Sequence, residues 1–343
     1  MENKNPIRFI DLFAGIGGFR YAIQNASNKL EVPVKCVFSS EIDKECQRAY
    51  QENFGEVPKG DITQIVAESI PNHDFLLAGF PCQPFSIIGK RKGFEDTRGT
   101  LFFDIARILA AKKPTTFVLE NVKLLVAHNK GKTIKRIIET LEELGYHTTY
   151  KVLNALDFGL PQKRERVFIV GFRKPSIFNW PEEKVQMKSL NEILEKEVPK
   201  QYYVSGHIRK KRLSQYQKLP TKELTIWHEN KAGHISVYPF SCALRAGASY
   251  NYLLVNGKRR LTSREMLRLQ GFPESFKIVC SYTQTRKQAG NSLPVPVAQA
   301  IIERVFQACG WTQMTYCSGT DLVVNGQLRL FEDQTKYYEI AKA

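Results

Sequence analysis

Short apolar segments alternate with helical patterns over the first half of the chain. Between the expected strands at 115–119 and 147–153, Ile134, Ile137 and Leu141 recur at helical spacing, and Gly145 follows where a helix would end. The other expected strands, rich in Val, Ile and Phe, are at 7–12, 34–40, 74–79 and 166–172. Strands that alternate with helices are typical of a parallel sheet covered on both faces. The pattern predicts an α/β fold with a doubly wound, mostly parallel sheet.

The alternation stops after Phe172. Basic, Tyr-rich sequence with scattered prolines follows, and strand-like alternation returns only near 234–255. Asn256-Gly257 predicts a tight type I′ hairpin turn, because both residues tolerate positive φ angles. Helices are expected at 262–270 and 294–308, and the second is expected to return the chain to the first domain.

These patterns predict two domains, the second smaller and mostly β or irregular. The expected boundaries are 1–178 with 289–320 for the first domain, 179–273 for the second, and 274–288 for a hinge. Residues 321–343 contain a further hairpin pattern, from Leu322 to Phe331, whose role the sequence does not indicate.

The charge is uneven along the chain. Among 343 residues, 50 Lys and Arg oppose 34 Asp and Glu, a balance of +16. Residues 173–288 hold 22 basic and 9 acidic side chains, whereas the segments on either side are nearly neutral. Such a region is typical of binding to a phosphate backbone, although a basic run like 209–212 is as often a solvated face. A membrane partner is not expected, since no basic amphipathic helix or long apolar run is present.

The cysteines do not predict a disulfide framework or a metal site. There are seven, scattered along the chain and without a Cys-x-x-Cys pair. The start of the chain has no apolar signal core. We therefore expect a cytoplasmic protein without a metal ion.

Polar residues follow the first strands where a ligand is expected. The first strand leads into a turn with Gly15, Gly17 and Gly18, but Arg20 stands where a dinucleotide fingerprint needs glycine. Glu41 closes the second strand, where a carboxylate can accept both hydroxyls of a ribose, and Asp61 with Ile62 closes the next unit. Together they indicate an adenosine-containing cofactor, although each acid alone would more often cap a helix.

Chemically reactive side chains follow later strands. Cys82 lies between two prolines after the strand at 74–79, which makes it a candidate nucleophile, although a lone cysteine is usually a small buried hydrophobe. Glu120 ends the next strand, and Arg164 and Arg166 precede another. A zinc deaminase also has a Pro-Cys element, but its His-x-Glu and Pro-Cys-x-x-Cys signatures are absent.

With these residues in order, the chain resembles the DNA (cytosine-C5) methyltransferases of bacterial restriction-modification systems. The resemblance covers nearly all of residues 7–308. It is carried by FAGIGG at 13–18, PCQ at 81–83, ENV at 120–122, QKRER at 162–166, RE at 264–265 leading into QGFP at 270–273, and GNS at 290–292. It implies a Rossmann-like methyltransferase sheet with a smaller target-recognition domain, acting as a monomer with S-adenosylmethionine on duplex DNA.

The resemblance also implies roles for individual residues. Cys82 would add to C6 of a flipped cytosine, Glu120 would hydrogen-bond N3 and the amino group, and Arg166 would donate to O2. Arg164 would hold the catalytic loop or the carboxyl in position. The implied cofactor contacts are Phe13, Gly15, Gly17, Gly18, Glu41, Ile42, Asp61, Ile62, Pro81, Leu101, Asn291 and Leu293. Ile42 departs from the family, which often has a bulky aromatic residue there.

The expected DNA contacts lie in two regions. A loop at about 83–99 combines glycines, basic residues and two apolar side chains, and would contribute Gln83, Ile87, Ile88, Lys90, Arg91, Lys92 and Arg98. Burial of Ile87 and Ile88 in the catalytic domain is the alternative. The second domain would contribute Lys231, His234, Arg245, Ser249 and Tyr250, where the family's Thr-Leu-like dipeptide appears as Ala243-Leu244. Methylation of tRNA and a DNA-binding protein without catalysis remain alternatives.

Overall fold

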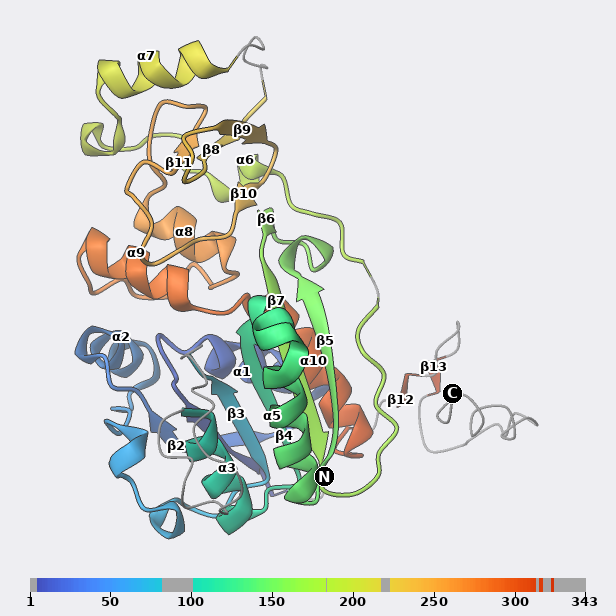
Figure 1. The fold of residues 1–343 in the computed structure, drawn as a ribbon. Coiled ribbons are helices and arrows are strands. Elements are labelled where there is room, and N and C mark those ends of the chain that lie inside the picture. Colours follow the sequence, from blue (N-terminus) through green and yellow to red (C-terminus); the bar gives the residue numbers. More distant parts are fainter. Residues whose placement is uncertain are drawn as a thin grey trace.

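A six-stranded sheet forms the base of the molecule (Figure 1). The structure is a computed structural model that describes residues 5–81, 101–182, 184–216 and 223–312, with short strands at 315–316 and 322–323. The strand order is β2-β1-β3-β4-β7-β5, and only β7 runs against its neighbours. The strands are β1 (Ile7–Leu12), β2 (Val34–Ser40), β3 (Phe75–Gly79), β4 (Thr116–Val122), β5 (His147–Asn154) and β7 (Glu165–Phe172). The predicted mostly parallel sheet is confirmed.

Helices cover both faces of this sheet because successive strand residues point to opposite sides. Phe9 packs in one apolar cluster with α1 (Gly18–Leu30) and α10 (Val295–Ala308). Its neighbour Ile10 packs in the other cluster with α3 (Leu101–Lys112) and α5 (Lys132–Glu143). The remaining helices on this part of the chain are α2 (Lys44–Phe54) and α4 (Leu124–Ala127), with single turns η1 (Ile62–Gln64), η2 (Ala67–Ser69), η4 (His128–Gly131) and η5 (Ala155–Asp157).

A second, smaller unit stands above the sheet in Figure 1 and contains a three-stranded antiparallel sheet. Its order is β11 (Leu253–Val255), β8 (Ile226–Glu229), β9 (Ile235–Tyr238), with α6 (Leu190–Ile193), η6 (Lys200–Tyr202), α7 (Gly206–Gln215) and α8 (Ser263–Leu269) around it. The predicted turn is confirmed, because Asn256 and Gly257 have φ angles of 49° and 64°. The expected start of strand structure near 234 is wrong. β8 lies earlier, and Ile226 and Trp227 are both buried, so it lacks the alternation that would reveal it.

Three elements join the parts of the chain. The short strands β6 (Gln162–Lys163) and β10 (Ser241–Cys242) pair in parallel, and α9 (Tyr282–Asn291) leads back to the large sheet. Within the described C-terminal residues, β12 (Thr315–Tyr316) pairs with β13 (Leu322–Val323), and the rest of the predicted hairpin lies outside the described residues. In the described ranges no helix is long and apolar enough to cross a membrane, and no three His, Cys, Asp or Glu gather as metal ligands.

Asp11 of β1 is a buried carboxyl group beneath the strand ends. Its side chain is 1% exposed, and neither of its carboxylate oxygens has a hydrogen-bond partner among the described residues. Burial raises the pKa of Asp11 to about 8, against the opposing effect of the Arg20 guanidinium and with a smaller contribution from Glu41 in the same direction as burial. The folded protein therefore binds this proton more tightly than the unfolded chain does.

We expect this proton to make stability depend on pH. Because the pKa of Asp11 rises from 3.8 to about 8 on folding, the free energy of unfolding should fall as the pH rises between these values. Asp11→Asn should flatten that dependence, measured by urea unfolding from pH 5 to pH 8, whereas the exposed Glu31→Gln should keep the wild-type slope. Equal slopes for wild type and Asp11→Asn would contradict this assignment.

Candidate active site

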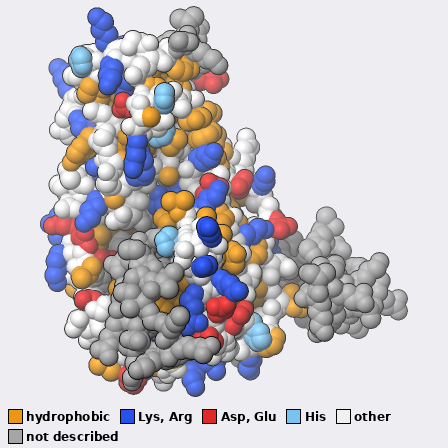
Figure 2. Space-filling model, in the orientation of Figure 1, with side chains coloured by type: hydrophobic (Ala, Val, Ile, Leu, Met, Phe, Trp, Pro, Cys, Tyr) orange, Lys and Arg blue, Asp and Glu red, His pale blue; other side chains and the backbone are white. Residues whose placement is uncertain are grey.

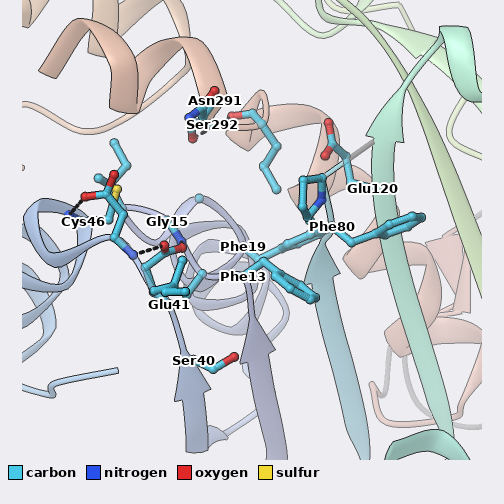
Figure 3. Close-up of a pocket in the computed structure, with 18 of the residues that line it drawn as sticks. Phe13, Gly15, Phe19, Ser40, Glu41, Cys46, Phe80, Glu120, Asn291 and Ser292 are labelled. Atoms are coloured by element: carbon cyan, nitrogen blue, oxygen red, sulfur yellow. Dashed lines mark hydrogen bonds between the residues drawn. The ribbon is translucent and has the colours of Figure 1, made fainter. Parts of the chain in front are cut away.

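A cavity of about 700 Å³ opens at the carboxyl ends of β1 to β4 (Figure 3). This is the edge where open α/β sheets bind ligands. The predicted cofactor and catalytic residues that line it are Phe13, Gly15, Gly18, Glu41, Ile42, Asp61, Ile62, Pro81, Leu101, Glu120, Arg166, Asn291 and Leu293. Residues separated by as much as 280 positions in the sequence thus meet around one space.

The loop after β1 is held in left-handed backbone conformations. Phe13, Gly15 and Gly17 have φ angles of 55°, 56° and 87°. A positive φ angle is energetically unfavourable for a bulky residue such as Phe13. Backbone strain of this kind is concentrated at functional sites. Gly17 does not line the cavity. A Cβ there would lie 2.2 Å from the Phe54 ring, so Gly17 permits close packing of α2 rather than access to a ligand.

Glu41 ties two loops together at one end of the cavity. One carboxylate oxygen accepts a hydrogen bond from the Gly15 amide at 2.8 Å, and the other accepts from the Asp43 amide at 2.7 Å. Burial raises the pKa of Glu41, while these amides oppose the shift. At the same end Asp61 caps η1 by accepting from the Thr63 amide, and Ile42 is 67% exposed at the rim. The predicted carboxylates therefore lie together.

A carboxyl and a guanidinium meet at the opposite end of the cavity, where Figure 3 shows Glu120 near Phe80. Nε of Arg166 lies 3.0 Å from Oε1 of Glu120, and both side chains are largely buried. Burial raises the pKa of Glu120 although Arg166 opposes the shift, and burial lowers the pKa of Arg166. Asn121 donates to the Phe80 carbonyl at 2.8 Å, which holds the end of β3 beside this pair. The pair presents a carboxyl with a raised pKa next to a fixed donor.

Arg164 lies outside the cavity, at the junction between the two parts of the chain. It is 1% exposed and donates to the carbonyls of Leu244, at 2.9 Å, and of Gly290 and Ser292, at 3.0 and 2.5 Å. Among the residues described, it makes no hydrogen bond to Glu120. Burial lowers the pKa of Arg164 to about 9. Arg164 thus hydrogen-bonds backbone carbonyls, and its charge acts on the Glu120 carboxyl electrostatically, by opposing the rise of the Glu120 pKa.

The predicted DNA contacts of the second unit are all exposed. Lys231 and His234 lie at the turn between β8 and β9, whereas Arg245, Ser249 and Tyr250 follow β10. Figure 2 shows Lys and Arg side chains distributed over this unit. The remaining predicted residues, Cys82, Gln83, Ile87, Ile88, Lys90, Arg91, Lys92 and Arg98, lie outside the described residues.

Several cavity residues gave no signal in the sequence. Phe19, Ser40, Cys46, Phe80 and Gln288 line the space. Phe19 and Ser40 are sequence neighbours of residues that were predicted to bind a ligand because they follow strand ends. The same reasoning could therefore have identified them. Gln288 reaches the cavity only because α9 packs beside α2, where its amide donates to the Glu45 carbonyl at 3.1 Å.

The fold and this cavity together define an S-adenosylmethionine-dependent methyltransferase. More particularly, the chain belongs to the C-5 cytosine-specific DNA methylase family, which it matches over residues 7–307. It is 56% identical over 293 residues to the Type II methyltransferase M.NgoBI of Neisseria gonorrhoeae, and 55% identical over 297 residues to M.HaeII of Haemophilus aegyptius. Each alignment covers 85% of this chain and 90% of the relative.

A solved structure supports the fold. DNMT2 of Spodoptera frugiperda superposes with a TM-score of 0.69 at 20% identity, covering 88% of this chain and 99% of that one. The cavity also suits the cofactor. Its volume of about 700 Å³ is in the range of small-molecule sites, and Gly18 leaves room beside Leu293, where a Cβ would lie 3.0 Å from Cγ.

Gly290 provides a test of the junction next to this cavity. A Cβ at Gly290 would lie 2.4 Å from the amide nitrogen of Ala246, and a backbone atom cannot yield as a flexible side chain does. We expect Gly290→Ala to lower the free energy of unfolding by about 1–3 kcal/mol, measured by urea titration. Gly247→Ala is the control, because a Cβ there meets no atom within 4 Å and should change stability by less than about 0.5 kcal/mol. Equal stability of the two variants would contradict this packing.

Proposed function

We propose that this enzyme methylates C5 of cytosine within a short, specific sequence of duplex DNA, using a flipped base and covalent addition of Cys82. The observation that carries the proposal is the Glu120–Arg166 pair, whose atoms approach to 3.0 Å at the edge of the cofactor cavity. A protonatable carboxyl and a guanidinium match the N3, amino and O2 edge of cytosine. Membership of the cytosine-specific family agrees with this match.

The chemistry begins at Cys82, which follows the cavity residue Pro81. Its thiolate forms a bond to C6, and the electron pair of the C5–C6 double bond is pushed toward N3, which leaves C5 nucleophilic. Glu120 donates a proton to N3, and its raised pKa favours the protonated form that this step requires. Arg166 donates to O2 and stabilises the developing charge.

When bound, S-adenosylmethionine supplies an electrophilic methyl group. Phe13, Glu41 and Asp61 would hold its adenosine end, and Asn291 and Leu293 its amino-acid end. After methylation, a base that the sequence does not identify removes the C5 proton. The C5–C6 double bond is restored as the Cys82 thiolate leaves and Glu120 recovers its proton.

Because C5 lies inside the base stack, the target nucleotide must leave the duplex, at a cost of a few kcal/mol. The basic second unit would hold the DNA backbone and bases over the cavity. Residues 1–178 with 289–320 would form the catalytic domain, 179–273 the target-recognition domain and 274–288 the hinge. In this proposal the enzyme acts as a monomer and uses no metal ion. A DNA substrate and the unpaired described cysteines favour the cytoplasm.

Methylation of tRNA is the rival function with the same chemistry. The segment between Arg166 and Arg264 is large and basic, and such a recognition unit favours duplex DNA. A DNA-binding protein without catalysis is the rival from another class. The buried ion pair of Glu120 and Arg166 argues against it, since a pure binding protein has no need to bury two charges beside a cavity.

Transfer of tritium from labelled S-adenosylmethionine decides between the substrates. We expect label in duplex DNA of mixed sequence and none in total tRNA, both assayed in parallel with the full chain. The DNA signal should fall steeply between about 50 and 200 mM salt, because phosphate contacts release counterions. Label confined to tRNA would overturn the DNA assignment.

Cys82→Ser tests the covalent step. The variant should bind DNA with wild-type affinity but form no adduct with DNA that contains 5-fluorocytosine, because a hydroxyl is a far weaker nucleophile than a thiolate. Denaturing electrophoresis after incubation with cofactor measures the adduct. Cys309→Ser, which changes a thiol at the end of α10 that does not line the cavity, serves as the control and should retain it. Adduct formation by Cys82→Ser would remove Cys82 as the nucleophile.

A further inference from the structure

We infer that Arg245 is a specificity-determining residue, whose guanidinium reads a guanine adjoining the target cytosine in the DNA. This inference rests on the proposed function. It is argued from the contacts that hold residues 243–250, a segment that we call the recognition strap. The strap follows β10 and is hydrogen-bonded to Arg164, just before β7, and to Arg286 of α9.

Buried side chains of β6 and of the residue just before β7 fasten the strap. Oε1 of Gln162 accepts from the Leu244 amide at 2.9 Å, and Nη1 of Arg164 donates to the Leu244 carbonyl at 2.9 Å. Both side chains are at most 1% exposed, so water does not compete for these hydrogen bonds. Arg164 precedes Arg166 by two residues, and the strap is therefore fixed relative to the Glu120–Arg166 pair.

The other side of the strap is held by α9. Nη1 of Arg286 donates to the Ala248 carbonyl at 2.8 Å. Gly290, which lines the cavity, approaches Ala246 so closely that a Cβ would lie 2.4 Å from its amide nitrogen. Ala246, the residue after Arg245, therefore contacts Gly290 in the wall of the cavity.

Arg245 itself is the exposed side chain of this fastened segment. Its amide donates to the Tyr252 hydroxyl at 2.9 Å, and its guanidinium carbon lies 4.8 Å from the centre of the Tyr252 ring. Within the described residues its guanidinium has no hydrogen bond and no carboxylate partner. Two other arginines of this unit do have a carboxylate partner, since Arg212 pairs with Glu229 and Arg259 with Glu265.

A stacked, unpaired guanidinium suits base recognition. Stacking on Tyr252 fixes the plane of the five N–H donors and lowers the entropy lost on binding. Two parallel donors match O6 and N7 of guanine in the major groove, which is the commonest specific contact of arginine. A phosphate contact would need neither the fixed plane nor the fastened backbone, and it is the alternative that the experiment addresses.

The experiment compares the sequences that variants methylate. Wild type, Arg245→Ala and Arg245→Lys are expressed in a host without cytosine methylation, and plasmid DNA is read by bisulfite sequencing. We expect Arg245→Ala to lose discrimination on the order of 10- to 100-fold at one guanine position while other positions keep their preference. Tyr252→Leu, which removes the stacking surface, should relax the same position more weakly. Lys210→Ala removes an equal charge from the exposed face of α7 and should leave the preference unchanged.

The outcomes separate the inference from the function on which it rests. An unchanged preference with a uniformly lower rate for Arg245→Ala would indicate a phosphate contact and overturn the inference. Relaxation at a position other than guanine would overturn it as well. Absence of methylation by wild type would instead contradict the proposed function. Thermal unfolding of each variant checks that the fold is retained.

Discussion

The arrangement of this protein depends on buried hydrogen bonds between side chains of β6–β7 and backbone groups far away in the sequence. Arg164 donates to the carbonyls of Leu244, Gly290 and Ser292, and Gln162 bonds the Leu244 amide and the Leu269 carbonyl. Removing one such partner would leave a polar group unpaired in the interior, at a cost of about 1–3 kcal/mol. These bonds therefore set how the smaller unit sits above the sheet.

The same constraint links recognition to chemistry. Arg164 directly precedes β7 and donates to carbonyls at the junction, whereas Arg166, the second residue of β7, lines the cavity. The strands β4 and β7 pair antiparallel, with Glu120 opposite Phe168. Arg166 lies two residues before Phe168 on β7, and its side chain reaches Glu120 diagonally across the two strands. A shift of the strap would be transmitted through backbone carbonyls to this pair.

Much of the fold and site could be predicted from the chain. Strand ends in a parallel sheet share one edge, so Gly15, Glu41, Asp61 and Glu120 were expected together, and all of them line the cavity. Gly17 illustrates the limit. Its place in a glycine-rich turn indicated a ligand, whereas its contact with Phe54 comes from the packing of α2, which no local pattern encodes. β8 was missed because both Ile226 and Trp227 are buried.

The sequence by itself determined the layered α/β sheet, the basic character of the smaller unit and the chemical types at the strand ends. These depend on periodicity, charge and residue order, which are local properties. Only the tertiary structure decided that Arg164 bonds three carbonyls and that the Arg245 guanidinium lies over the Tyr252 ring. The physical reason is that partners separated by 80 to 128 residues are selected by packing, and chain order does not specify which carbonyl a buried guanidinium will meet.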